Sequence, residues 1–452
     1  MNNFRPIDRD TGFLLPPSVD EWLPERHLAR FVVEVVAGLD LRSMTGSYRG
    51  SGEAPYHPEL LLGLIIYGYA TGVFSSRKLE RATYDSVAFR FIAANQHPDH
   101  DTIAVFRRRF LAQIAPLFAQ VLCVAREMGV LQLGTVALDG TKIHANACRH
   151  SALSYEHADR IEVQLQAEVA DLLAKAEATD QADVPDGMSV PAELARREQR
   201  LAALARAKAT IEARAKERHA FERAEHEAKL KAREAKTAAT GKKPRGRPPA
   251  APVEGPLPTD QVNLTDQGSR IMPVAGGGFE QCYNAQAAVT AGLLVIAADV
   301  VQAPNDKQQL EPMLGKLADL PDELGTTDAL LADNGYFSES NVNACAAAGI
   351  APLIAMGREA HHPTLDERFA EAPEPPTDPT PLEAMQHRLK TPEGKKLYAL
   401  RKQMPEPVFG IIKSVLGFRQ FLLRGLDNVR GEWTLVTMAW NIKRMFVLAG
   451  AN

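Results

Sequence analysis

Residues 151 to about 240 constrain the fold more than any other part of the sequence. They contain almost no aromatic residues and are rich in Ala, Glu, Arg and Lys. This composition leaves little apolar surface to bury and favours long solvent-exposed helices or an antiparallel helical hairpin. The Pro- and Gly-rich stretch that follows, "ATGKKPRGRPPAAPVEGPLPTD", predicts a flexible, extended linker. We therefore predict that residues 151–255 are an insertion into another domain.

The segment before residue 134 has a helical pattern. Apolar positions recur at helical spacing in "DEWLPERHLARFVVEVVAGL" and in "HPELLLGLIIYGYA", and the second of these predicts a buried helix. A long helix is predicted over "DTIAVFRRRFLAQIAPLFAQVLCVAREMG", with Asp101 or Thr102 as its cap. Residues 1–133 are therefore predicted to form an all-α N-terminal domain.

Three consecutive cations lie on that long helix, namely Arg107, Arg108 and Arg109. Short helices joined by short loops are compatible with a helix-turn-helix unit that reads DNA. The solvated face of a helical bundle explains the same arginines about equally well. A DNA-binding role for the N-terminal domain is thus a hypothesis with a structural alternative.

From residue 134 the pattern changes to β. "GTVALDGTKIHA" contains a short apolar strand that ends at an Asp, and "QCYNAQAAVT" with "LLVIAADVVQA" predicts a hairpin. "ALLADNGYF" predicts another strand, followed by a helix from Ser338 and by a strand in "IAPLIAM". Residues 363–385 form a second loop-like, acidic region. The pattern predicts an α/β domain built from residues 134–150 and 256–452, with the helical segment inserted between them.

The charge is unevenly distributed. The net charge is -4, yet Lys and Arg number 2 against 9 Asp and Glu over residues 151–190 and 17 against 8 over residues 191–250. Four cysteines lie far apart without a C-x-x-C pair, which argues against a disulfide framework and a zinc site and indicates packed thiols. The N-terminal sequence has neither a basic start nor an apolar core, and no apolar run reaches a span of about 20 residues. A cytoplasmic protein without a membrane partner is expected.

Two aspartates stand at matching places in the β pattern. Asp139 closes the apolar stretch "VAL" and Asp333 closes "LLA", and a Gly follows each within two residues. Ligands of sheet-based folds gather at the carboxyl ends of strands, so both acids are well placed to bind one. For either residue alone, Asp before Gly is also ordinary turn chemistry.

A third carboxylate, Glu406, stands between Pro405 and Pro407 with cations nearby. Pro407 suits the first turn of a helix over "PVFGIIKSVL", so Glu406 is predicted at a helix N-terminus, where the dipole favours its ionised form. If it packs beside the two aspartates, three carboxylates converge and require cations, and oxygen ligands select Mg²⁺ or Mn²⁺. A helix cap without any partner is the alternative for Glu406 alone.

The order of these features resembles the ribonuclease-H-like catalytic domain of DDE transposases. "YALRKQMPEPVFGIIK" is similar to the Tyr-Arg-Glu-Lys signature of bacterial insertion-sequence transposases, and "NLTDQGSRIM", "YNAQ" and "QAPNDKQQLEPM" resemble one branch of that family. The matching positions are Tyr398, Arg401, Glu406 and Lys413. Four residues instead of three separate Arg401 from Glu406, which implies either a loosened register or a share of the arginine's role for Lys402.

The resemblance implies a metal-dependent enzyme that acts on DNA. Asp139, Asp333 and Glu406 would hold two Mg²⁺ or Mn²⁺ ions, which activate the attacking hydroxyl and stabilise the leaving oxygen during strand cleavage and strand transfer. It also implies that the phosphates of the terminal DNA are bound by Tyr398, Arg401, Lys402 and Lys413.

A second DNA-binding candidate lies at the end of the insertion. "KKPRGRPP" resembles an AT-hook, in which Arg245 and Arg247 would enter a narrow A·T minor groove and Gly246 would permit close approach of the backbone. A basic, Pro-rich linker is an equally good interpretation, because motifs this short arise by chance.

The expected partners are therefore the double-stranded ends of a mobile element and its target DNA, bound by a homo-oligomer that is associated with the nucleoid when on DNA. A DNA-binding or regulatory relative without catalysis is the alternative function. A structural coiled-coil protein would explain the insertion and leave the three acids unexplained.

Overall fold

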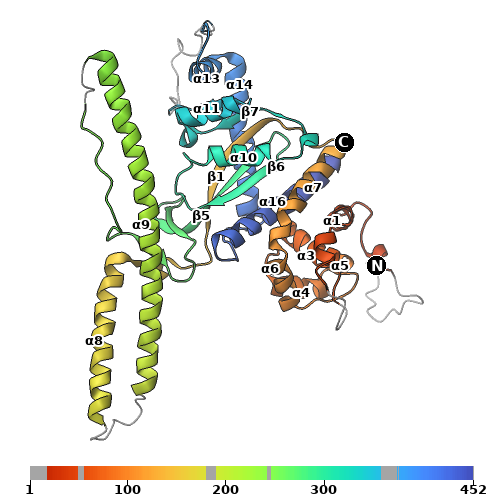
Figure 1. Ribbon diagram of the computed structural model, residues 1–452. Coiled ribbons are helices and arrows are strands. Elements are labelled where there is room, and N and C mark those ends of the chain that lie inside the picture. The colour runs from red at the N-terminus through yellow and green to blue at the C-terminus, as the bar shows by residue number, and fades with distance from the viewer. Residues whose placement is uncertain are drawn as a thin grey trace, which may run out of the picture. The chain divides into compact units, whose positions relative to one another are not determined.

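The structure is a computed structural model of the chain, and it describes residues 18–48, 55–179, 190–241, 246–357, 374 and 376–450. The chain divides into two compact units. The first unit joins Met1–Asn146 to Met272–Asn452, and the second is Ala147–Ile271. Figure 1 shows the elements of both.

A six-stranded mixed sheet is the centre of the first unit among the described residues. The strand order is β4-β5-β1-β7-β8, and β6 also pairs with β5. The central strand β1 runs antiparallel to β5 and parallel to β7, while β7 and β8 are parallel to each other. The strands are β1 (Gly134–His144), β4 (Arg270–Pro273), β5 (Phe279–Thr290), β6 (Val295–Val301), β7 (Thr327–Ala332) and β8 (Ala351–Ile354).

Strand β1 is longer than the sequence predicted. Instead of ending at Asp139, it continues to His144, because β5 pairs with it from Val136 to His144. Asp139 therefore lies inside the strand, opposite Ala287. Strand β7, in contrast, ends at Ala332 as predicted, and Asp333 follows it directly.

The other predicted elements of this domain are confirmed. Strands β5 and β6 form the antiparallel hairpin, and β8 falls within "IAPLIAM". Helix α11 (Glu339–Ala347) begins after Ser338, whose hydroxyl oxygen accepts the Asn341 N–H at 3.1 Å. Helix α10 (Leu310–Ala318) connects β6 to β7. These elements follow local signals, namely alternation, a turn and a cap.

The N-terminal part is helical, as predicted. Its helices are α1 (Leu28–Ala37), α2 (Arg42–Thr45), α3 (Pro58–Thr71), α4 (Ser76–Asp85), α5 (Val87–Ile92), α6 (His100–Arg109) and α7 (Ile114–Glu127). Helix α3 is apolar on most of its circumference and is buried over most of its length, as such helices must be. Within the part of the chain that the structure describes, no single helix is long and apolar enough to span a membrane.

The predicted long helix over residues 101–129 is two helices, and the prediction was wrong in both its start and its continuity. Asp99 is the cap, since its carboxylate accepts the Thr102 N–H at 2.7 Å. The chain turns after Arg109, where Phe110 and Leu111 are buried. Pro116 then sits in the first turn of α7, where a missing N–H costs no hydrogen bond.

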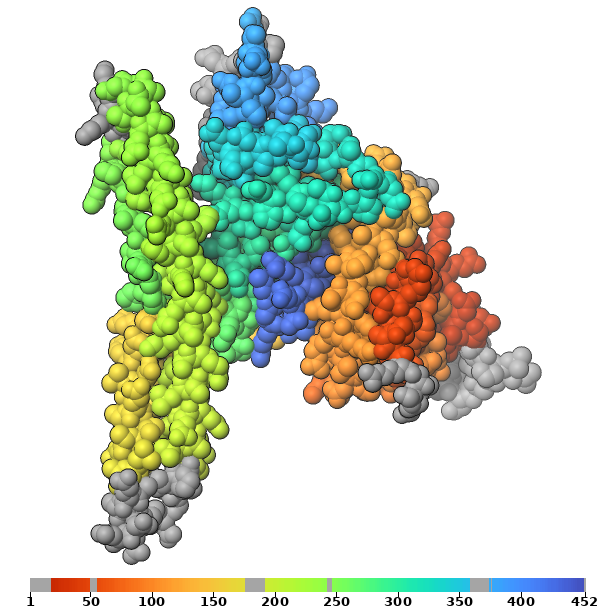
Figure 2. Space-filling model, viewed as in Figure 1, coloured from red at the N-terminus to blue at the C-terminus, as the bar shows by residue number. Residues whose placement is uncertain are grey.

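The N-terminal helices share a core with the last helix of the chain, α16 (Leu426–Gly450). Helices α1, α3 and α7 all pack against it, and α16 also packs on β6 of the sheet. In Figure 2 the dark blue α16 lies directly beside the orange N-terminal helices. Trp433 and Trp440 anchor α16 through indole N–H bonds to the backbone oxygens of Gln286 and Leu293.

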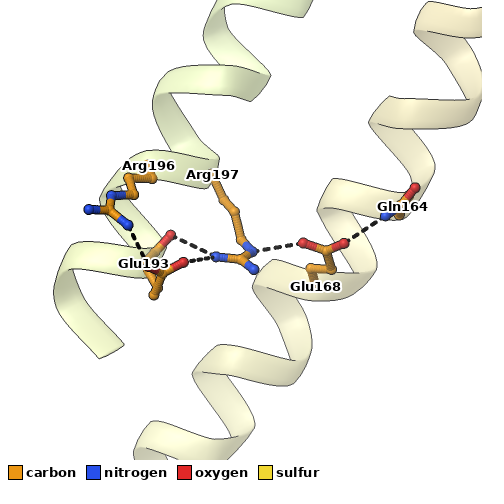
Figure 3. Close-up of polar contacts among 5 residues, drawn as sticks. All are labelled: Gln164, Glu168, Glu193, Arg196 and Arg197. Atoms are coloured by element: carbon orange, nitrogen blue, oxygen red, sulfur yellow. Dashed lines mark hydrogen bonds and ion pairs between the residues drawn. The ribbon is translucent and has the colours of Figure 1, made fainter. Parts of the chain in front are cut away.

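The second unit contains the predicted antiparallel helical hairpin, formed by α8 (Tyr155–Thr179) and α9 (Val190–Thr240). Ion pairs cross between the helices, as Figure 3 shows for Arg197, which lies 2.8 Å from Glu168 and 2.6 Å from Glu193 on its own helix. A small apolar core lies at the base of the hairpin, made of Leu153, Ala158, Leu165, Leu204, Ala207, Ile211 and Val262. The short strands β2 (Ala152–Ser154) and β3 (Gln261–Asn263) pair beside it.

The described part of the Pro- and Gly-rich segment is extended, as predicted, and it is held along α9. Arg233 donates to the carbonyl oxygen of Gly246 at 3.1 Å, and Arg218 donates to that of Gly255 at 3.0 Å. Arg218 also binds both carboxylate oxygens of Asp260, at 2.6 and 2.8 Å. The segment is thus tied to the helix, where the sequence predicted a free linker.

Two smaller predictions need correction. Residues 381–385, expected in a loop, begin helix α13 (Pro381–Lys390), because Thr380 and Glu383 form a capping box. Residues 363–373 and 375 of that acidic region lie outside the described residues. Cys148 is exposed, where a packed thiol was expected, whereas Cys282 and Cys345 are buried.

Candidate active site

Asp139 and Asp333 lie side by side on neighbouring strands. Strands β1 and β7 are parallel and pair Ala137 with Leu331, so the residues two positions further along, the two aspartates, come next to each other. Each carboxylate is fixed by a nearby backbone N–H: Asp139 accepts from Gly140 and Asp333 from Gly335, both at 2.8 Å. The sequence prediction that these acids meet is supported by this register, although only Asp333 stands at a strand end.

The Asp139 side chain is only 18% exposed, and its nearest cation among the described residues, Arg401, is 3.9 Å away. The pKa of Asp139 is raised to about 6, chiefly by burial and also by the negative charges of Asp333 and Asp306, while the Gly140 N–H and Arg401 act in the opposite direction. A carboxylate with such a pKa in a folded protein lacks a sufficient counter-charge. The site therefore offers a favourable place for an additional cation.

Glu406 lies in the first turn of α15 (Pro405–Gly410). The helix begins at Pro405, two residues before the predicted start. In any helix the N–H groups of the first turn have no partner within the helix, so Pro405 and Pro407, which lack an N–H, both fit there. The Glu406 side chain is 53% exposed. The two prolines thus define the helix start and present the carboxylate at the positive end of the helix dipole.

Arg401 connects Glu406 to the aspartates. It lies in the short turn η6 (Leu400–Gln403), and its guanidinium is 3.9 Å from the Asp139 carboxylate and 3.6 Å from that of Glu406. Its side chain is only 12% exposed, and its Nε has no hydrogen-bond partner among the described residues. Arg401 therefore provides the positive charge between the two acids, at distances longer than those of hydrogen-bonded ion pairs.

Sequence reasoning missed a further acid at this site, Asp306. Its Oδ1 accepts hydrogen bonds from the side-chain amides of Asn284 and Gln286, both at 2.7 Å. Tyr336 in turn donates its hydroxyl hydrogen to Gln286 Oε1. A signal was present: in "YNAQ" the two amides are two residues apart on a strand, so they share a face, and polar residues at such buried positions need a partner.

Tyr336 lies near all three aspartates. It is fully buried, and burial together with the charges of Asp306, Asp139 and Asp333 holds its pKa well above the ordinary value. The phenol therefore stays protonated and donates its hydrogen bond.

Lys413 is tied to β1 beside these acids. It lies in a π-helical turn, Ile411–Val415, and its ammonium donates to Thr141 Oγ1 at 3.0 Å and to the Lys142 carbonyl oxygen at 3.2 Å. Burial lowers its pKa. A π-helical turn contains more residues than an α-helical turn. Lys413 is therefore not at the α-helical angle from Glu406 that the sequence predicted.

Tyr398 and Lys402 lie next to Arg401 on α14 (Pro392–Ala399) and η6. Together with Leu389, Lys395 and Ala399, these three residues line a pocket of about 240 Å³. Lys402 is exposed and Tyr398 is half-buried. The structure thus gathers four of the predicted DNA-contacting residues around the acids, and their contact with DNA stays a prediction.

The three N-terminal arginines do not form one surface row. Arg107 points inward, where it donates to the Tyr69 hydroxyl and the Phe74 carbonyl oxygen, both at 3.1 Å, and Tyr69 donates to the buried Glu432 at 3.0 Å. These hydrogen bonds give Arg107 a structural role between helices, and its contact with DNA stays a prediction. Arg108 and Arg109 are exposed.

Only part of the AT-hook candidate lies within the described residues. Arg245 lies outside the described residues, and Arg247 is exposed in the second unit. Gly246 has a φ of 101°, a conformation that favours glycine.

Within the described ranges, no group of three or more His, Cys, Asp or Glu side chains is close enough together to hold a metal ion. Asp139 and Asp333 are adjacent, and Glu406 is separated from them by Arg401.

Comparison with known proteins gives two matches to families. Residues 17–109 match the family described as "Transposase domain (DUF772)", and residues 377–446 match the "Transposase DDE domain". The second match includes Arg401, Glu406 and Lys413. No curated protein and no solved structure matches the chain. The two matches support the assignment of this chain, with its helical N-terminal region and mixed α/β fold, to the insertion-sequence transposases of the DDE type.

Proposed function

We propose that this protein binds the inverted-repeat ends of its mobile element and catalyses metal-dependent cleavage and strand transfer of DNA. The observation that carries the proposal is the register of β1 and β7, which brings Asp139 and Asp333 together, with Glu406 linked to them through Arg401. The match to a DDE transposase domain supports the same reaction class.

The catalytic domain is proposed to have a ribonuclease-H-like fold. In support, an antiparallel hairpin pairs with one side of β1, and two parallel strands, β7 and β8, follow on its other side. The acids lie on the central strand, after the next parallel strand and on a C-terminal helix. This is the arrangement that the sequence order implied.

The acidic side chains of the site are of the type that binds divalent cations, although Arg401 separates Glu406 from the two aspartates. All the acidic groups are oxygen donors, which Mg²⁺ and Mn²⁺ prefer, and the pKa of Asp139 is raised by burial and by the neighbouring aspartates, so a cation nearby would be favourable. Asp139, Asp333 and Glu406 would hold two such ions. When bound, the ions would polarise the scissile phosphate and activate the attacking hydroxyl.

The chain's own cations would position the DNA. Arg401 has a forked guanidinium beside both Asp139 and Glu406, so it can bind a phosphate that enters the site. Lys402 and Tyr398 line the adjoining pocket. Lys413 is already fixed by Thr141, and from there it would contact the backbone beside the cut.

Regions away from the acids are proposed to recognise the rest of the element. The exposed Arg108 and Arg109 belong to the N-terminal domain, residues 1–133, and Arg245 and Arg247 belong to the insertion, residues 151–255. Strand transfer that joins two ends requires more than one active site, so a homo-oligomer on DNA forms part of the proposal.

The test uses a labelled duplex that carries the inverted repeat flanking the gene. The parent should nick it in Mg²⁺, and Asp139→Asn, Asp333→Asn and Glu406→Gln should each abolish nicking while they retain gel-shift binding. Asp299→Asn is the matched control, because Asp299 is an acid on β6, only 11% exposed, that pairs with Arg430 at 3.0 Å. DNA binding by a parent that never nicks would favour the non-catalytic relative.

A further inference from the structure

We propose that Asp306 is a fourth carboxylate of the metal-binding site, and that Gly140, Asn284 and Gln286 hold it beside Asp139 and Asp333. This inference rests on the proposed function and adds a residue to its site. It assigns a role to the "QAPND" segment that precedes α10.

The first observation is a cradle built for one carboxylate oxygen. Asp306 Oδ1 accepts from Asn284 Nδ2 and Gln286 Nε2, both at 2.7 Å, and both amide residues are completely buried. Gln286 is itself oriented by the Tyr336 hydroxyl. Fixing buried polar side chains costs conformational entropy and desolvation, and a fully hydrogen-bonded network holds its members in one arrangement. The network of Asn284, Gln286 and Tyr336 therefore fixes the position of Asp306.

The second observation is the glycine that follows Asp139. A Cβ at Gly140 would lie 2.6 Å from Asp306 Oδ1 and 2.3 Å from Gln286 Nε2, closer than real Cβ contacts. The absence of a side chain at position 140 therefore allows Asp306 to approach the backbone of β1. From the sequence, Gly140 was explained as a turn residue. In the folded protein it lies in β1 and leaves space for Asp306.

The other carboxylate oxygen of Asp306 faces the second aspartate. A Cβ placed on Gly335 would lie 3.8 Å from Asp306 Oδ2 and 2.9 Å from Asp333 Oδ1. Asp306 thus reaches from the backbone beside Asp139 to the loop that holds Asp333. Its Oδ2 is not used by the two amides.

A third observation indicates a ligand. Asn284 Oδ1 is buried and has no hydrogen-bond partner among the described residues, and it lies 2.9 Å from the position of a Cβ on Gly140. Of the four buried side-chain polar atoms without a partner in the described part of the chain, two, Asn284 Oδ1 and Arg401 Nε, belong to this site. A buried oxygen without a partner is costly unless a cation or its bound water satisfies it.

The alternative is that Asp306 only accepts hydrogen bonds from the two amides. Asp306→Asn separates the two roles, because Asn keeps an Oδ1 that can accept both amide hydrogen bonds and loses the negative charge. A structural role predicts little change in that variant, whereas a role in metal binding predicts weaker binding of the cation.

The experiment measures Mn²⁺ binding to the full chain without DNA, by the electron paramagnetic resonance signal of free Mn²⁺. Asp306→Asn should weaken binding about tenfold or more, by analogy with the loss of groups that support a metal ligand. Tyr336→Phe, which removes the hydrogen bond to Gln286 and keeps every carboxylate, should weaken it by a smaller factor. Asp299→Asn should bind like the parent. Nicking by Asp306→Asn should recover at high Mn²⁺ concentration.

A second measurement needs no variant. With Fe²⁺ in place of Mg²⁺, ascorbate and hydrogen peroxide generate hydroxyl radicals at the metal and cut the backbone around it. Cuts near residue 306, in addition to cuts near 139 and 333, are expected. Cuts at 139 and 333 alone, with parental Mn²⁺ affinity in Asp306→Asn, would overturn the role of Asp306 and leave the proposed function intact. Failure of the parent to bind Mn²⁺ would overturn both.

Discussion

The helical hairpin and the acid site both contain charged side chains, but the distances between opposite charges differ. On the hairpin, Lys208 lies 2.7 Å from both Asp159 and Glu162, and Arg197 donates to Glu168 at 2.8 Å. At the acid site, Arg401 stays 3.6 to 3.9 Å from its two acids. The hairpin lowers the pKa of Glu168, chiefly through hydrogen bonds from Gln164 and Arg197, while burial at the site raises that of Asp139.

These distances distinguish charges that are paired within the fold from charges that are available to bind a ligand. The hairpin pairs are partly exposed to solvent, with side chains 21 to 48% exposed, and each charge has a close partner, so each pair contributes little and none requires a further partner. Asp139, in contrast, is only 18% exposed and lies 3.9 Å from its cation Arg401, and a poorly compensated charge in such a place costs stability in the free protein. Such unsatisfied groups are typical of functional sites.

The largest expected effect is on catalysis. Asp139→Asn and Asp333→Asn should each reduce the nicking rate by about 10³-fold or more, and the double variant should lose little beyond either single one, because ligands of one site act as a unit. Rates of Mg²⁺-dependent nicking on one duplex measure this. Changes on the hairpin should leave the chemical step unaltered. Multiplicative losses in the double variant would show that the two aspartates act separately.

Stability should respond in opposite directions in the two regions. Asp139→Asn should raise the free energy of unfolding at pH 7, without metal, by about 1–3 kcal/mol, because it removes a buried charge whose pKa is about 6. Asp260→Asn should lower that free energy by about 1 kcal/mol, because it breaks the paired contact with Arg218. Urea unfolding of the parent and both variants provides the measurement.

The pH dependence has a defined sign. The raised pKa means that folded Asp139 holds a proton between about pH 4 and pH 6 that the unfolded chain has released. The parent should therefore lose this part of its stability as the pH rises through that window, and Asp139→Asn should not. An identical pH profile for both proteins would contradict a buried, unsatisfied Asp139.

Replacing the hairpin tests whether its charges serve the fold of the rest. Because Ser151 and Leu264 are joined by a backbone hydrogen bond of 2.9 Å, residues 152–263 can be replaced by a short Gly/Ser linker between close ends. The remaining protein should melt cooperatively and bind DNA about tenfold more weakly, since cations that contact phosphates are lost. Calorimetry and gel shifts measure both effects. Aggregation would show that the hairpin supports the other unit.

The smallest effect is expected for one hairpin ion pair. Arg197→Ala should change the melting temperature by about 1–2 °C at low salt and by less at high salt, because exposed pairs are weak and are screened. The variant Arg196→Ala, which removes an exposed pair within α9, is the matched control. A loss that persists at high salt would indicate packing by Arg197.

Local signals in the sequence predicted most elements of the fold. The hairpin of β5 and β6, the cap at Ser338 and the two helices of the insertion depend on near neighbours in the chain. The errors arose where distant segments decide. The end of β1 depends on its pairing with β5, and the break between α6 and α7 follows from the burial of Phe110 and Leu111.

The sequence singled out the three acids of the proposed site and not the groups around them. Asp139, Asp333 and Glu406 carry signals of turn and helix-start chemistry, so each could be selected from the sequence. Asp306 was not selected, because the signal in "YNAQ" marks two amides that need a partner, and only the folded sheet shows that this partner is Asp306. The inward turn of Arg107 likewise depends on Tyr69, on another helix.

The place of the hairpin in the chain has a consequence for biosynthesis. Strand β1 leaves the ribosome first, then the whole of residues 147–271, and only afterwards β5, which pairs with β1 along most of its length. Until then the edge of β1 has no partner from β5, and exposed strand edges promote aggregation. The hairpin can close early from its own local contacts, so it would shorten the effective loop that separates the two strands and speed their meeting.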